Sequence, residues 1–440
     1  MCNFREVLRM KKVRQIILFV SALCFLHIFA LSIEHVQAQE SIDVQAEAAI
    51  LIDADSGKIL YEKNADEKLA IASMTKMMTE YLVLEAIANN EIDWEQEVPI
   101  SEYAQQVSQN YSLSNVPLLE DVKYTVKELY EAMAIYSANG ATIALAELVA
   151  GSEANFVNMM NDKAQELGLG DVTFINTTGL NNKDLYGQHP AGGENEENMM
   201  SARSTARLAF HLLHDHPDVL QTASIPTKDF TKGLDAPLEM LNWNWMLEGL
   251  DLAYPGVDGL KTGSTDLAGF AFTGTVVKDD MRLISVVMKT DSAISRFRET
   301  AKLYDWAFSQ FSKEEIVPEG YQFDDATIPV VKGKQKEVPI EAKSSFEMIV
   351  RNNEKDQYEP EFILDESQLD EDGNLLAPLE KGAKVGTITV HYTGEGSDYG
   401  FITDEVTTHE VVIAEEVEKA NWFTLMMRSI GNFFSGLWNK

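Results

Sequence analysis

Three short motifs hold the residues of this chain that are best suited to chemistry. They are Ser73-Met74-Thr75-Lys76, Ser137-Ala138-Asn139 and Lys261-Thr262-Gly263. A serine hydroxyl is a poor nucleophile at neutral pH until a nearby base takes its proton. A serine and a lysine three positions apart share one face of a helix. The first motif therefore predicts a serine nucleophile that is activated by a lysine.

The lysine must lose its charge before it can act as this base. Met77 and Met78 continue an apolar run after Lys76, which predicts that the helix is buried. Burial and a second nearby cation both lower the pKa of a lysine, and Lys261 is the expected second cation. The first amides of a helix have no partner inside the helix. The N–H of Ser73 is therefore an expected donor to an oxyanion.

The other two motifs interrupt regular patterns. Ser137-Ala138-Asn139 separates two apolar helical stretches and predicts a short loop at the edge of a cleft. Lys261-Thr262-Gly263 precedes a strand-like run at 269–277, and a turn at 278–280 leads into a second apolar run. This order predicts an antiparallel hairpin. A glycine in a strand lets a ligand backbone come close, which is the role expected for Gly263.

The three ordered motifs are those of the serine β-lactamases and the penicillin-binding proteins. On these residues the chain resembles a low-molecular-mass penicillin-binding protein of the D-alanyl-D-alanine carboxypeptidase family. The resemblance implies that Ser73, Lys76 and Ser137 are the catalytic residues. In the family pattern the Ser137 hydroxyl relays a proton towards the leaving group.

The resemblance also implies a set of substrate-binding residues, which are Asn139, Lys261, Thr262, Gly263, Ser264 and Arg296. In this pattern the Asn139 amide binds the substrate backbone, the Lys261-Thr262 pair meets its carboxylate, and the Ser264 N–H is the second oxyanion donor. Arg296 matches the family arginine that pairs with the terminal carboxylate, because a planar guanidinium suits a bidentate carboxylate. Arg298 in the same SRFRET stretch is the competing candidate.

The elements that must position these residues predict an α+β protein. Apolar and polar residues alternate around Asp55-Ser56-Gly57-Lys58, which predicts a β-hairpin. A mostly helical stretch then covers 73–216, and strands follow around 255–290. This order predicts one mixed sheet flanked by a helical region, with the cleft at their junction, as in the penicillin-recognising, serine β-lactamase-like fold. Residues 39–312 are the predicted peptidase domain. Short alternating strands then predict a small β-rich domain over 313–414, which the resemblance implies is a stalk.

The N-terminus predicts export from the cytoplasm. Basic residues between Arg9 and Arg14 precede a long apolar stretch, and Val36-Gln37-Ala38 places small residues at the cleavage positions. Residues 1–38 are therefore predicted to be a secretory signal peptide. Met10 would open a more compact version of this signal, and an uncleaved membrane anchor is the rival interpretation.

The C-terminus, residues 415–440, predicts an amphipathic helix. Its apolar residues recur at helical spacing and are Trp422, Phe423, Met426, Met427, Ile430, Phe433, Phe434, Leu437 and Trp438. Arg428 and Asn432 interrupt the run, so it does not predict a membrane span. Aromatic amphipathic helices lie in the membrane interface, and packing against the protein itself is the alternative. With the signal peptide, this helix predicts a secreted enzyme held peripherally on the outer face of the cytoplasmic membrane.

Composition excludes several other classes of function. The net charge is −34, which makes nucleic acid an implausible partner. The only cysteines, Cys2 and Cys24, fall inside the predicted signal peptide, so the mature chain would carry no disulfide. The histidines of 211–216 lack an acidic partner at a metalloprotease spacing. No metal and no cofactor is therefore expected.

The resemblance implies a serine-type carboxypeptidase that removes the terminal D-Ala from peptidoglycan pentapeptides through an acyl-enzyme on Ser73. Its partners would be peptidoglycan stem peptides and inhibitory β-lactams. A class A β-lactamase shares two motifs but needs an extra glutamate for deacylation, and the segment 171–180 holds none. A D,D-endopeptidase fits the same residues. A non-catalytic β-lactam sensor or scaffold is the alternative from another class, and the retention of all three motifs argues against it.

Overall fold

A computed structural model gives the structure of this chain. It describes residues 42–322, 327–394, 398–403 and 409–428. The predicted signal peptide at 1–38 and the end of the predicted C-terminal helix, 429–440, lie outside the described residues. The described residues form an α+β domain followed by an all-β domain.

A five-stranded sheet organises the first domain. In the sheet order β2-β1-β11-β10-β9, its strands are β2 (Ile59–Lys63), β1 (Ala48–Asp53), β11 (Met281–Thr290), β10 (Gly269–Lys278) and β9 (Val257–Thr265). Every neighbouring pair is antiparallel. The prediction of a mixed sheet was therefore wrong, because the strand at the start of the domain pairs antiparallel with the last strand of the later hairpin. The predicted hairpin of β10 and β11 is confirmed.

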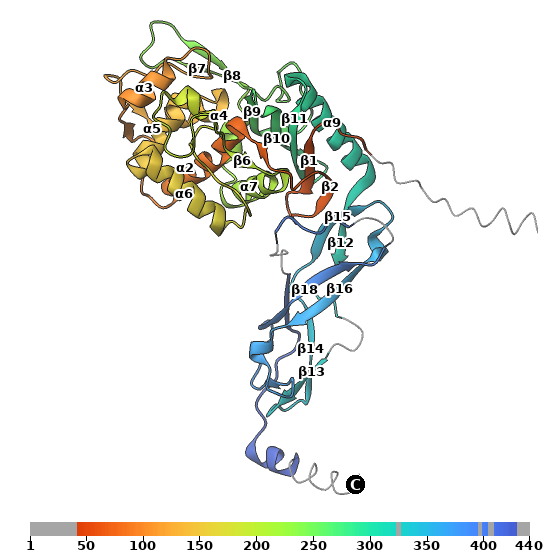
Figure 1. Ribbon diagram of the computed structural model, residues 1–440. Helices are drawn as coiled ribbons and strands as arrows, with labels where there is room; N and C mark the ends of the chain where they lie inside the picture. The colour runs from red at the N-terminus through yellow and green to blue at the C-terminus, as the bar shows by residue number, and fades with distance from the viewer. Residues whose placement is uncertain (1–41, 323–326, 395–397, 404–408, 429–440) are drawn as a thin grey trace, which may run out of the picture. The chain divides into compact units, whose positions relative to one another are not determined.

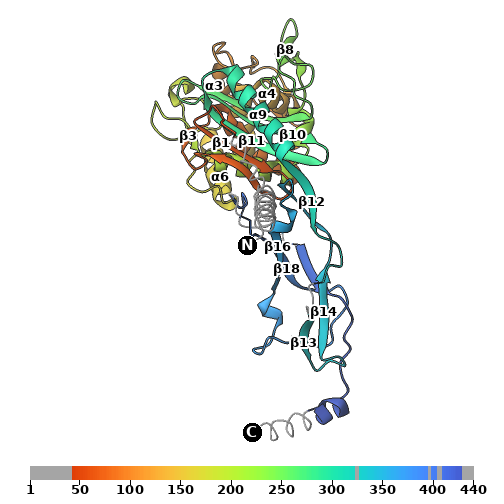
Figure 2. The same cartoon turned by 90° about the vertical axis from the view of Figure 1, so that its right-hand side faces the viewer.

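Helices cover both faces of this sheet. Along β1, Ile50 and Ile52 face one hydrophobic cluster and Leu51 faces the other, as the two-residue period of a strand requires. Helix α9 (Ala293–Gln310) packs on one face against β10 and β11. Helix α7 (Ala202–Asp215) packs on the opposite face against β1 and β11 (Figure 1). Figure 2 views the sheet from the side of α9, with β1, β11 and β10 side by side.

The helical region lies on the α7 side of the sheet. Its elements are the 3₁₀ helices η1 (Ala72–Thr75) and η2 (Asn182–Leu185), and the helices α2 (Lys76–Ala88), α3 (Glu102–Ser108), α4 (Val126–Tyr136), α5 (Asn139–Ala150), α6 (Glu153–Glu166) and α8 (Val219–Ala223). Short pairs of strands connect them, namely β3 (Leu69–Ala70) with β6 (Met199–Met200), β4 (Glu97–Val98) with β5 (Tyr124–Thr125), and β7 (Thr227–Phe230) with β8 (Leu238–Leu241).

Side-chain caps fix where these helices begin. Ser101, Ser152, Ser201 and Ser292 each accept a hydrogen bond from the backbone N–H three residues further on. Helix α4 begins with a capping box, in which Thr125 and Glu128 each bind the backbone of the other. These caps satisfy amides that would otherwise lack a partner.

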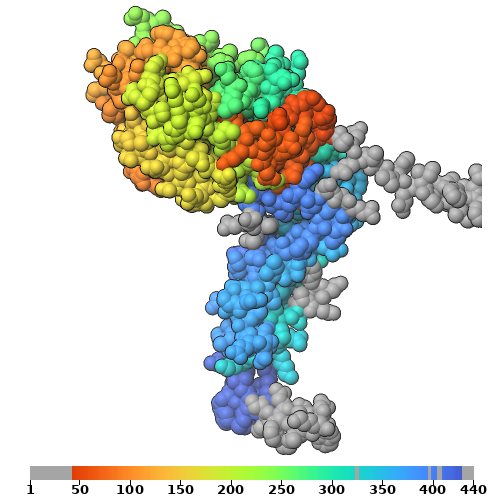
Figure 3. Space-filling view, viewed as in Figure 1, coloured from red at the N-terminus to blue at the C-terminus, as the bar shows by residue number. Residues whose placement is uncertain are grey.

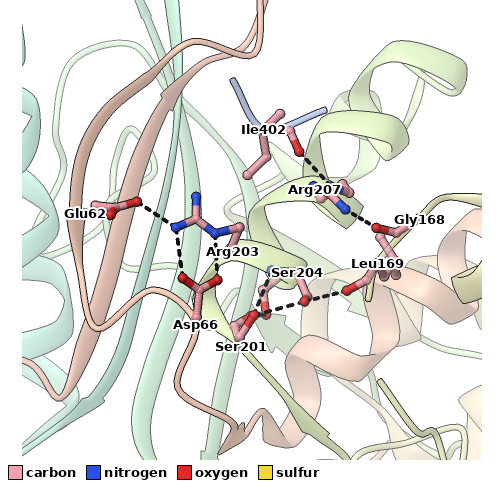
Figure 4. Close-up of polar contacts among 10 residues, drawn as sticks. Glu62, Asp66, Gly168, Leu169, Ser201, Arg203, Ser204, Arg207 and Ile402 are labelled. Atoms are coloured by element: carbon pink, nitrogen blue, oxygen red, sulfur yellow. Dashed lines mark hydrogen bonds and ion pairs between the residues drawn. The ribbon is translucent and has the colours of Figure 1, made fainter. Parts of the chain in front are cut away.

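Polar contacts hold α7 against its surroundings (Figure 4). Arg203 donates to Asp66 at 2.7 Å and to Glu62, a residue of β2, at 2.7 Å. Arg207 donates to the carbonyl oxygen of Ile402 at 2.6 Å. Helix α7 therefore connects the β1–β2 hairpin with the segment 398–403. In the space-filling view this hairpin (red) lies at the surface beside the helical region (yellow) (Figure 3).

The second domain consists of strands, as predicted. Two of them, β12 (Phe311–Val317) and β15 (Phe346–Arg351), pair with each other. A six-stranded sheet in the order β16-β18-β19-β14-β13-β17 contains β16 (Tyr358–Leu364), β18 (Lys384–Tyr392), β19 (His409–Ile413), β14 (Glu337–Ala342), β13 (Thr327–Val331) and β17 (Leu375–Leu376), with short 3₁₀ helices η3 (Lys355–Gln357) and η4 (Glu366–Gln368) between strands. Buried residues such as Val338, Phe346 and Ile413 form its own core.

The described part of the C-terminal segment is helical over 422–428. Trp422 and Phe423 are 74% and 55% exposed there. Among the described residues, no helix combines the length and the apolar character needed to cross a membrane.

Candidate active site

The backbone around both motif serines is strained. Ser73 is the second residue of η1, and Ala72 before it has φ of +46°. Ser137 itself has φ of +59° at the end of α4. Residues other than glycine rarely adopt such angles, and they persist mainly where the surrounding structure enforces them, often at functional sites. A side chain at Gly179 would collide with the backbone of Ala72, so this glycine lets the segment 176–179 press against η1.

Lys76 is fully buried directly behind Ser73. Its Nζ lies 3.1 Å from Ser73 Oγ, 2.9 Å from Asn139 Oδ1 and 2.7 Å from the carbonyl oxygen of Thr178. Burial, reinforced by the charge of Lys261, lowers the pKa of Lys76 well below its ordinary value. A neutral amine has two hydrogens and one lone pair. When the hydrogens go to Asn139 and Thr178, the lone pair is left for the Ser73 proton.

Lys261 forms the second polar contact of the site. Its Nζ donates to Ser137 Oγ at 3.1 Å and to the carbonyl oxygen of Thr262 at 3.1 Å. Burial lowers the pKa of Lys261, the charge of Glu80 opposes this effect, and the charge of Arg296 adds to it. A protonated Lys261 can thus hold the Ser137 hydroxyl as an acceptor, which leaves the Ser137 proton available for transfer.

The predicted loop between two helices is present at the second motif. Helix α4 ends at Tyr136 and α5 begins at Asn139. The Asn139 side chain accepts from Lys76, and its Nδ2 donates to the carbonyl oxygen of Ser114 at 2.9 Å. Asn139 is therefore fixed on both sides and joins the first two motifs.

Strand β9 brings the third motif to the same place. It is an edge strand of the sheet and carries Thr262, Gly263 and Ser264. The sequence predicts that Gly263 makes room for a ligand, and the structure gives a further reason for a glycine here. A Cβ at this position would lie 2.5 Å from the carbonyl oxygen of Ile71. Gly263 is needed because β9 packs closely against the segment that leads into Ser73.

The structure separates the two candidate arginines. Arg296 is buried on α9 and lines the cleft, whereas Arg298 is exposed. The Arg296 Nη1 donates to the carbonyl oxygen of Gly263 at 3.3 Å, and its guanidinium lies 4.7 Å from the Phe297 ring centroid. Its Nε has no hydrogen-bond partner among the described residues. Burial lowers the pKa of Arg296 to about 10, so it stays a cation at neutral pH.

These residues surround one cleft of about 240 Å³. It is lined by Ser73, Ser114, Ser137, Trp243, Trp245, Thr262, Gly263, Ser264, Phe270, Ala293 and Arg296. A larger cavity of about 890 Å³, beside Asp55, Arg282 and Lys313, contains no residue of the three motifs. The larger cavity is therefore not the candidate active site, because the motif residues line the smaller cleft. Lys76 and Asn139 lie buried behind the cleft wall.

Sequence reasoning missed several residues of the site. The carbonyl oxygens of Thr178 and Ser114 bind Lys76 and Asn139, but a backbone acceptor leaves no signal in the sequence. Trp243 and Trp245 alternate with asparagines between two apolar pairs, and this pattern alone does not indicate a binding site. Within the described ranges, no group of three or more His, Cys, Asp or Glu residues is arranged to hold a metal ion.

Comparisons with known proteins agree with this geometry. The model of the D-alanyl-D-alanine carboxypeptidase family, peptidase S11, matches residues 34–292, and that of the penicillin-binding protein 5 C-terminal domain matches 311–419. The D-alanyl-D-alanine carboxypeptidase DacF of Bacillus subtilis is 31% identical over 383 residues, which cover 87% of this chain and 88% of the relative.

Two solved structures extend the comparison. The crystal structure of PBP3 from Streptococcus pneumoniae, described as a peptidoglycan synthesis regulatory factor, is 38% identical. It has a TM-score of 0.73 and covers 86% of this chain and 100% of its own. Penicillin-binding protein D2 of Listeria monocytogenes, in its ampicillin-bound form, is 32% identical, has a TM-score of 0.51 and covers 61% of this chain and 100% of its own.

The α+β fold with an all-β second domain is thereby confirmed as the penicillin-binding protein 5 architecture. Three motifs that are far apart in the sequence meet at one cleft of this fold, as the resemblance implied. The family model alone covers more than half of the chain. The chain belongs to the D-alanyl-D-alanine carboxypeptidase family of serine peptidases, the low-molecular-mass penicillin-binding proteins.

Proposed function

We propose that this chain is a serine-type D-alanyl-D-alanine carboxypeptidase, which removes the terminal D-Ala from the pentapeptides of peptidoglycan. One observation carries the proposal. Ser73 faces a buried Lys76 of lowered pKa, and Ser137 contacts Lys261 in the same cleft. A nucleophile with its base, a proton relay and a cation are the groups that acyl transfer needs.

Acylation begins when neutral Lys76 takes the proton of Ser73. The Ser73 Oγ attacks the carbonyl carbon of the penultimate D-Ala, and the charge that develops on the carbonyl oxygen is held by the N–H groups of Ser73 and Ser264. The C–N bond then breaks. The proton on Lys76 reaches the departing amine through Ser137, which Lys261 holds in place. Free D-Ala leaves, and Ser73 keeps the rest of the peptide as an ester.

Deacylation uses the same base, which now activates a water molecule instead of Ser73. Lys76, neutral again, takes a proton from water as the water oxygen attacks the ester carbonyl. The bond to Ser73 Oγ breaks and the hydroxyl is restored with the proton. The segment 171–180 supplies the carbonyl of Thr178 to Lys76 but carries no glutamate. A class A β-lactamase uses a glutamate for this step, so we assign slow release of β-lactams to this enzyme.

Arg296 supplies the selectivity for a free carboxylate. Arg296 lines the cleft and is a cation at neutral pH. Strand β9 is an edge strand, and an extended peptide can pair with such an edge. A stem peptide lying along β9 would end beside Arg296, where its terminal carboxylate finds a positive charge. A β-lactam, which also carries a carboxylate beside a reactive amide, would acylate Ser73 in the same position.

We also propose that the enzyme is secreted and held peripherally on the outer face of the cytoplasmic membrane. The signal-peptide pattern at 1–38 supports secretion. The exposed Trp422 and Phe423 in the short helix at 422–428 support attachment at a membrane interface. Replacing both aromatic residues with alanine should weaken binding of the protein to phospholipid vesicles in a flotation assay. Unchanged flotation would contradict the attachment.

The carboxypeptidase assignment has a direct test. Purified protein incubated with a soluble pentapeptide should yield the tetrapeptide and free D-Ala, which mass spectrometry detects. Ser73→Ala should abolish this turnover while the protein stays folded by circular dichroism. Cleavage of cross-linked dimers without release of D-Ala from the pentapeptide would instead make the enzyme an endopeptidase.

A further inference from the structure

Glu80 is a buried carboxyl next to the catalytic lysines, and the mechanism above does not use it. It lies four residues after Lys76 in α2, a spacing that places both side chains on one face of the helix. Glu80 is only 3% exposed. Its Oε1 has no hydrogen-bond partner among the described residues. A carboxylate in such a place is costly unless another charge compensates it.

The compensating charges belong to the active site. Helix α2 packs against β9, which carries Lys261, and against α4, which carries Tyr130. Burial raises the pKa of Glu80 to about 7, because the charges of Lys261 and Lys76 offset only part of the effect of burial. Glu80 is therefore a carboxylate above neutral pH, where the alkaline limb of the acylation profile lies. Tyr130 is buried with a hydroxyl that also lacks a partner among the described residues, and the charge of Glu80 adds to the effect of burial in raising its pKa.

Other charged residues on the elements packed against α2 have different contacts. Lys163 on α6 pairs with Glu85 at 2.8 Å, towards the far end of α2. Asp215, at the end of α7, accepts a hydrogen bond from Tyr81 at 2.8 Å. On α5, Glu147 is half-buried and none of the catalytic lysines contributes to the rise of its pKa. Glu80 is therefore the carboxyl that acts on both motif lysines.

The charges of the site explain what such a carboxyl contributes. Arg296 is a buried cation, and Lys261 beside Ser137 is a second buried cation when it is protonated. During acylation Lys76 takes the Ser73 proton and becomes a third cation in the same buried region. Like charges that share a buried site strongly disfavour one another. A carboxylate one helical turn from Lys76 offsets this repulsion at the moment when the third charge appears.

We propose that Glu80 is the buried counter-charge of Lys76 and Lys261 and thus a positioning residue for acylation. It stabilises the protonated Lys76 that forms as Ser73 attacks, and it keeps Lys261 protonated beside Ser137. This inference rests on the proposed acylation of Ser73 with Lys76 as the base. It assigns Glu80 no contact with the substrate.

The sign of the effect follows from the charge. The carboxylate of Glu80 raises the pKa of both lysines, so its removal lowers both. A less basic Lys76 accepts the Ser73 proton less well, which slows acylation. Lys261 then loses its proton at a lower pH, so the alkaline limb of the acylation profile moves towards acid. A shift of about one pH unit is the low end of what a neighbouring opposite charge produces.

The test measures acylation by a fluorescent penicillin at a series of pH values in the full-length protein. Glu80→Gln keeps the shape of the side chain and removes its charge. We expect an acylation rate constant about tenfold lower and an alkaline limb shifted to lower pH by about one unit. Glu80→Asp keeps the charge and should give a profile between those of wild type and Glu80→Gln. If Glu80→Gln does not fold, Glu80→Asp is used as the test variant in its place.

Glu147→Gln is the matched control, since it removes a half-buried carboxyl of raised pKa elsewhere in the helical region. Its pH profile should equal that of wild type. A folded Glu80→Gln protein with the wild-type profile would overturn the inference, as would an equal shift in Glu147→Gln. A lower melting temperature with an unshifted profile would make Glu80 merely structural. If wild type itself is not acylated, the proposed function fails rather than this inference.

Discussion

At the scale of single residues, the site depends on how protons are shared among buried groups. Lys76 has three oxygen neighbours within 3.1 Å, and only two of them can receive a hydrogen from a neutral amine. The third, Ser73 Oγ, must therefore donate its own hydrogen. Burial and Lys261 make the neutral amine available by lowering the pKa of Lys76. The hydrogen-bond geometry and the lowered pKa of Lys76 therefore both favour transfer of the proton from Ser73 Oγ to Lys76 Nζ.

Replacing Lys76 with arginine should not preserve activity. A guanidinium remains protonated and cannot act as the base. We expect acylation by penicillin to fall on the order of 10²–10⁴-fold, the usual loss when a general base is removed. Stopped-flow measurement of the acylation rate constant checks this, with Lys68→Arg as a control at a surface lysine. Acylation close to the wild-type rate in Lys76→Arg would exclude Lys76 as the base.

Arg296→Ala should separate substrates by their terminal group. A hydrogen bond to a charged group is typically worth about 1.5–3 kcal/mol. Turnover of a pentapeptide with a free carboxylate should therefore fall roughly ten- to hundred-fold, while a peptide amidated at its terminus should lose much less. Arg298→Ala, at an exposed position of the same helix, is the matched control and should change neither substrate. Equal losses on both substrates would make Arg296 structural.

At the scale of elements, the site exists because η1 and β9 pack closely. The approach of Gly263 to the carbonyl of Ile71 leaves no room for a Cβ. Ser73 and Ser264, the two expected oxyanion donors, lie on these two elements. The distance between η1 and β9 therefore decides whether both N–H groups can point at one oxygen.

Gly263→Ala should consequently impair both stability and chemistry. Forcing an extra carbon into a packed interior typically costs about 1–3 kcal/mol, so the free energy of unfolding in urea should fall by this amount. Acylation should slow as well, because η1 and β9 would move apart. Gly193→Ala is the control, since a Cβ there would meet only ordinary contacts with the Glu196 side chain. A Gly263→Ala enzyme with normal stability and acylation would contradict this view of the packing.

The elements also show what a sequence can predict. Strands β10 and β11 were predicted closely because apolar runs and a turn signal mark them locally. The mixed sheet was wrong because pairing direction between β1 and β11 depends on contacts far apart in the sequence. The packing role of Gly263 could not be predicted for the same reason, since Ile71 lies on another element. Glu80 can be noticed in the sequence, because it is a charged residue within the mostly apolar helical run that follows Lys76.

At the scale of the whole molecule, the segment 398–403 of the β-rich domain contacts the peptidase domain. Lys58 is almost completely buried there and pairs with Asp398. Ile402 joins the main hydrophobic core, and its N–H donates to the carbonyl oxygen of Gly57 at 2.8 Å. Burial lowers the pKa of Lys58 and the Asp398 carboxylate opposes this effect. The Lys58–Asp398 pair therefore joins the peptidase domain to the segment 398–403, and its lysine is buried.

Asp398→Asn should destabilise the protein because it leaves Lys58 buried without its counter-charge. Losing one partner of a fully buried pair costs about 3–5 kcal/mol. Asp398 is partly exposed, so we expect about 1–3 kcal/mol, after allowance for solvent screening. Thermal unfolding should show a lower melting temperature. Glu410→Gln, which removes an exposed pair with Lys343, should change it little. Equal effects of both variants would contradict a special role for the buried pair.

The proposed mechanism depends on Ser73 as the nucleophile, and one measurement tests this most directly. Protein treated with penicillin, digested and analysed by mass spectrometry should carry the drug on the peptide that contains Ser73. Ser73→Ala should carry none. An adduct on the peptide of Ser137 or Ser264, or undiminished labelling of Ser73→Ala, would contradict the mechanism.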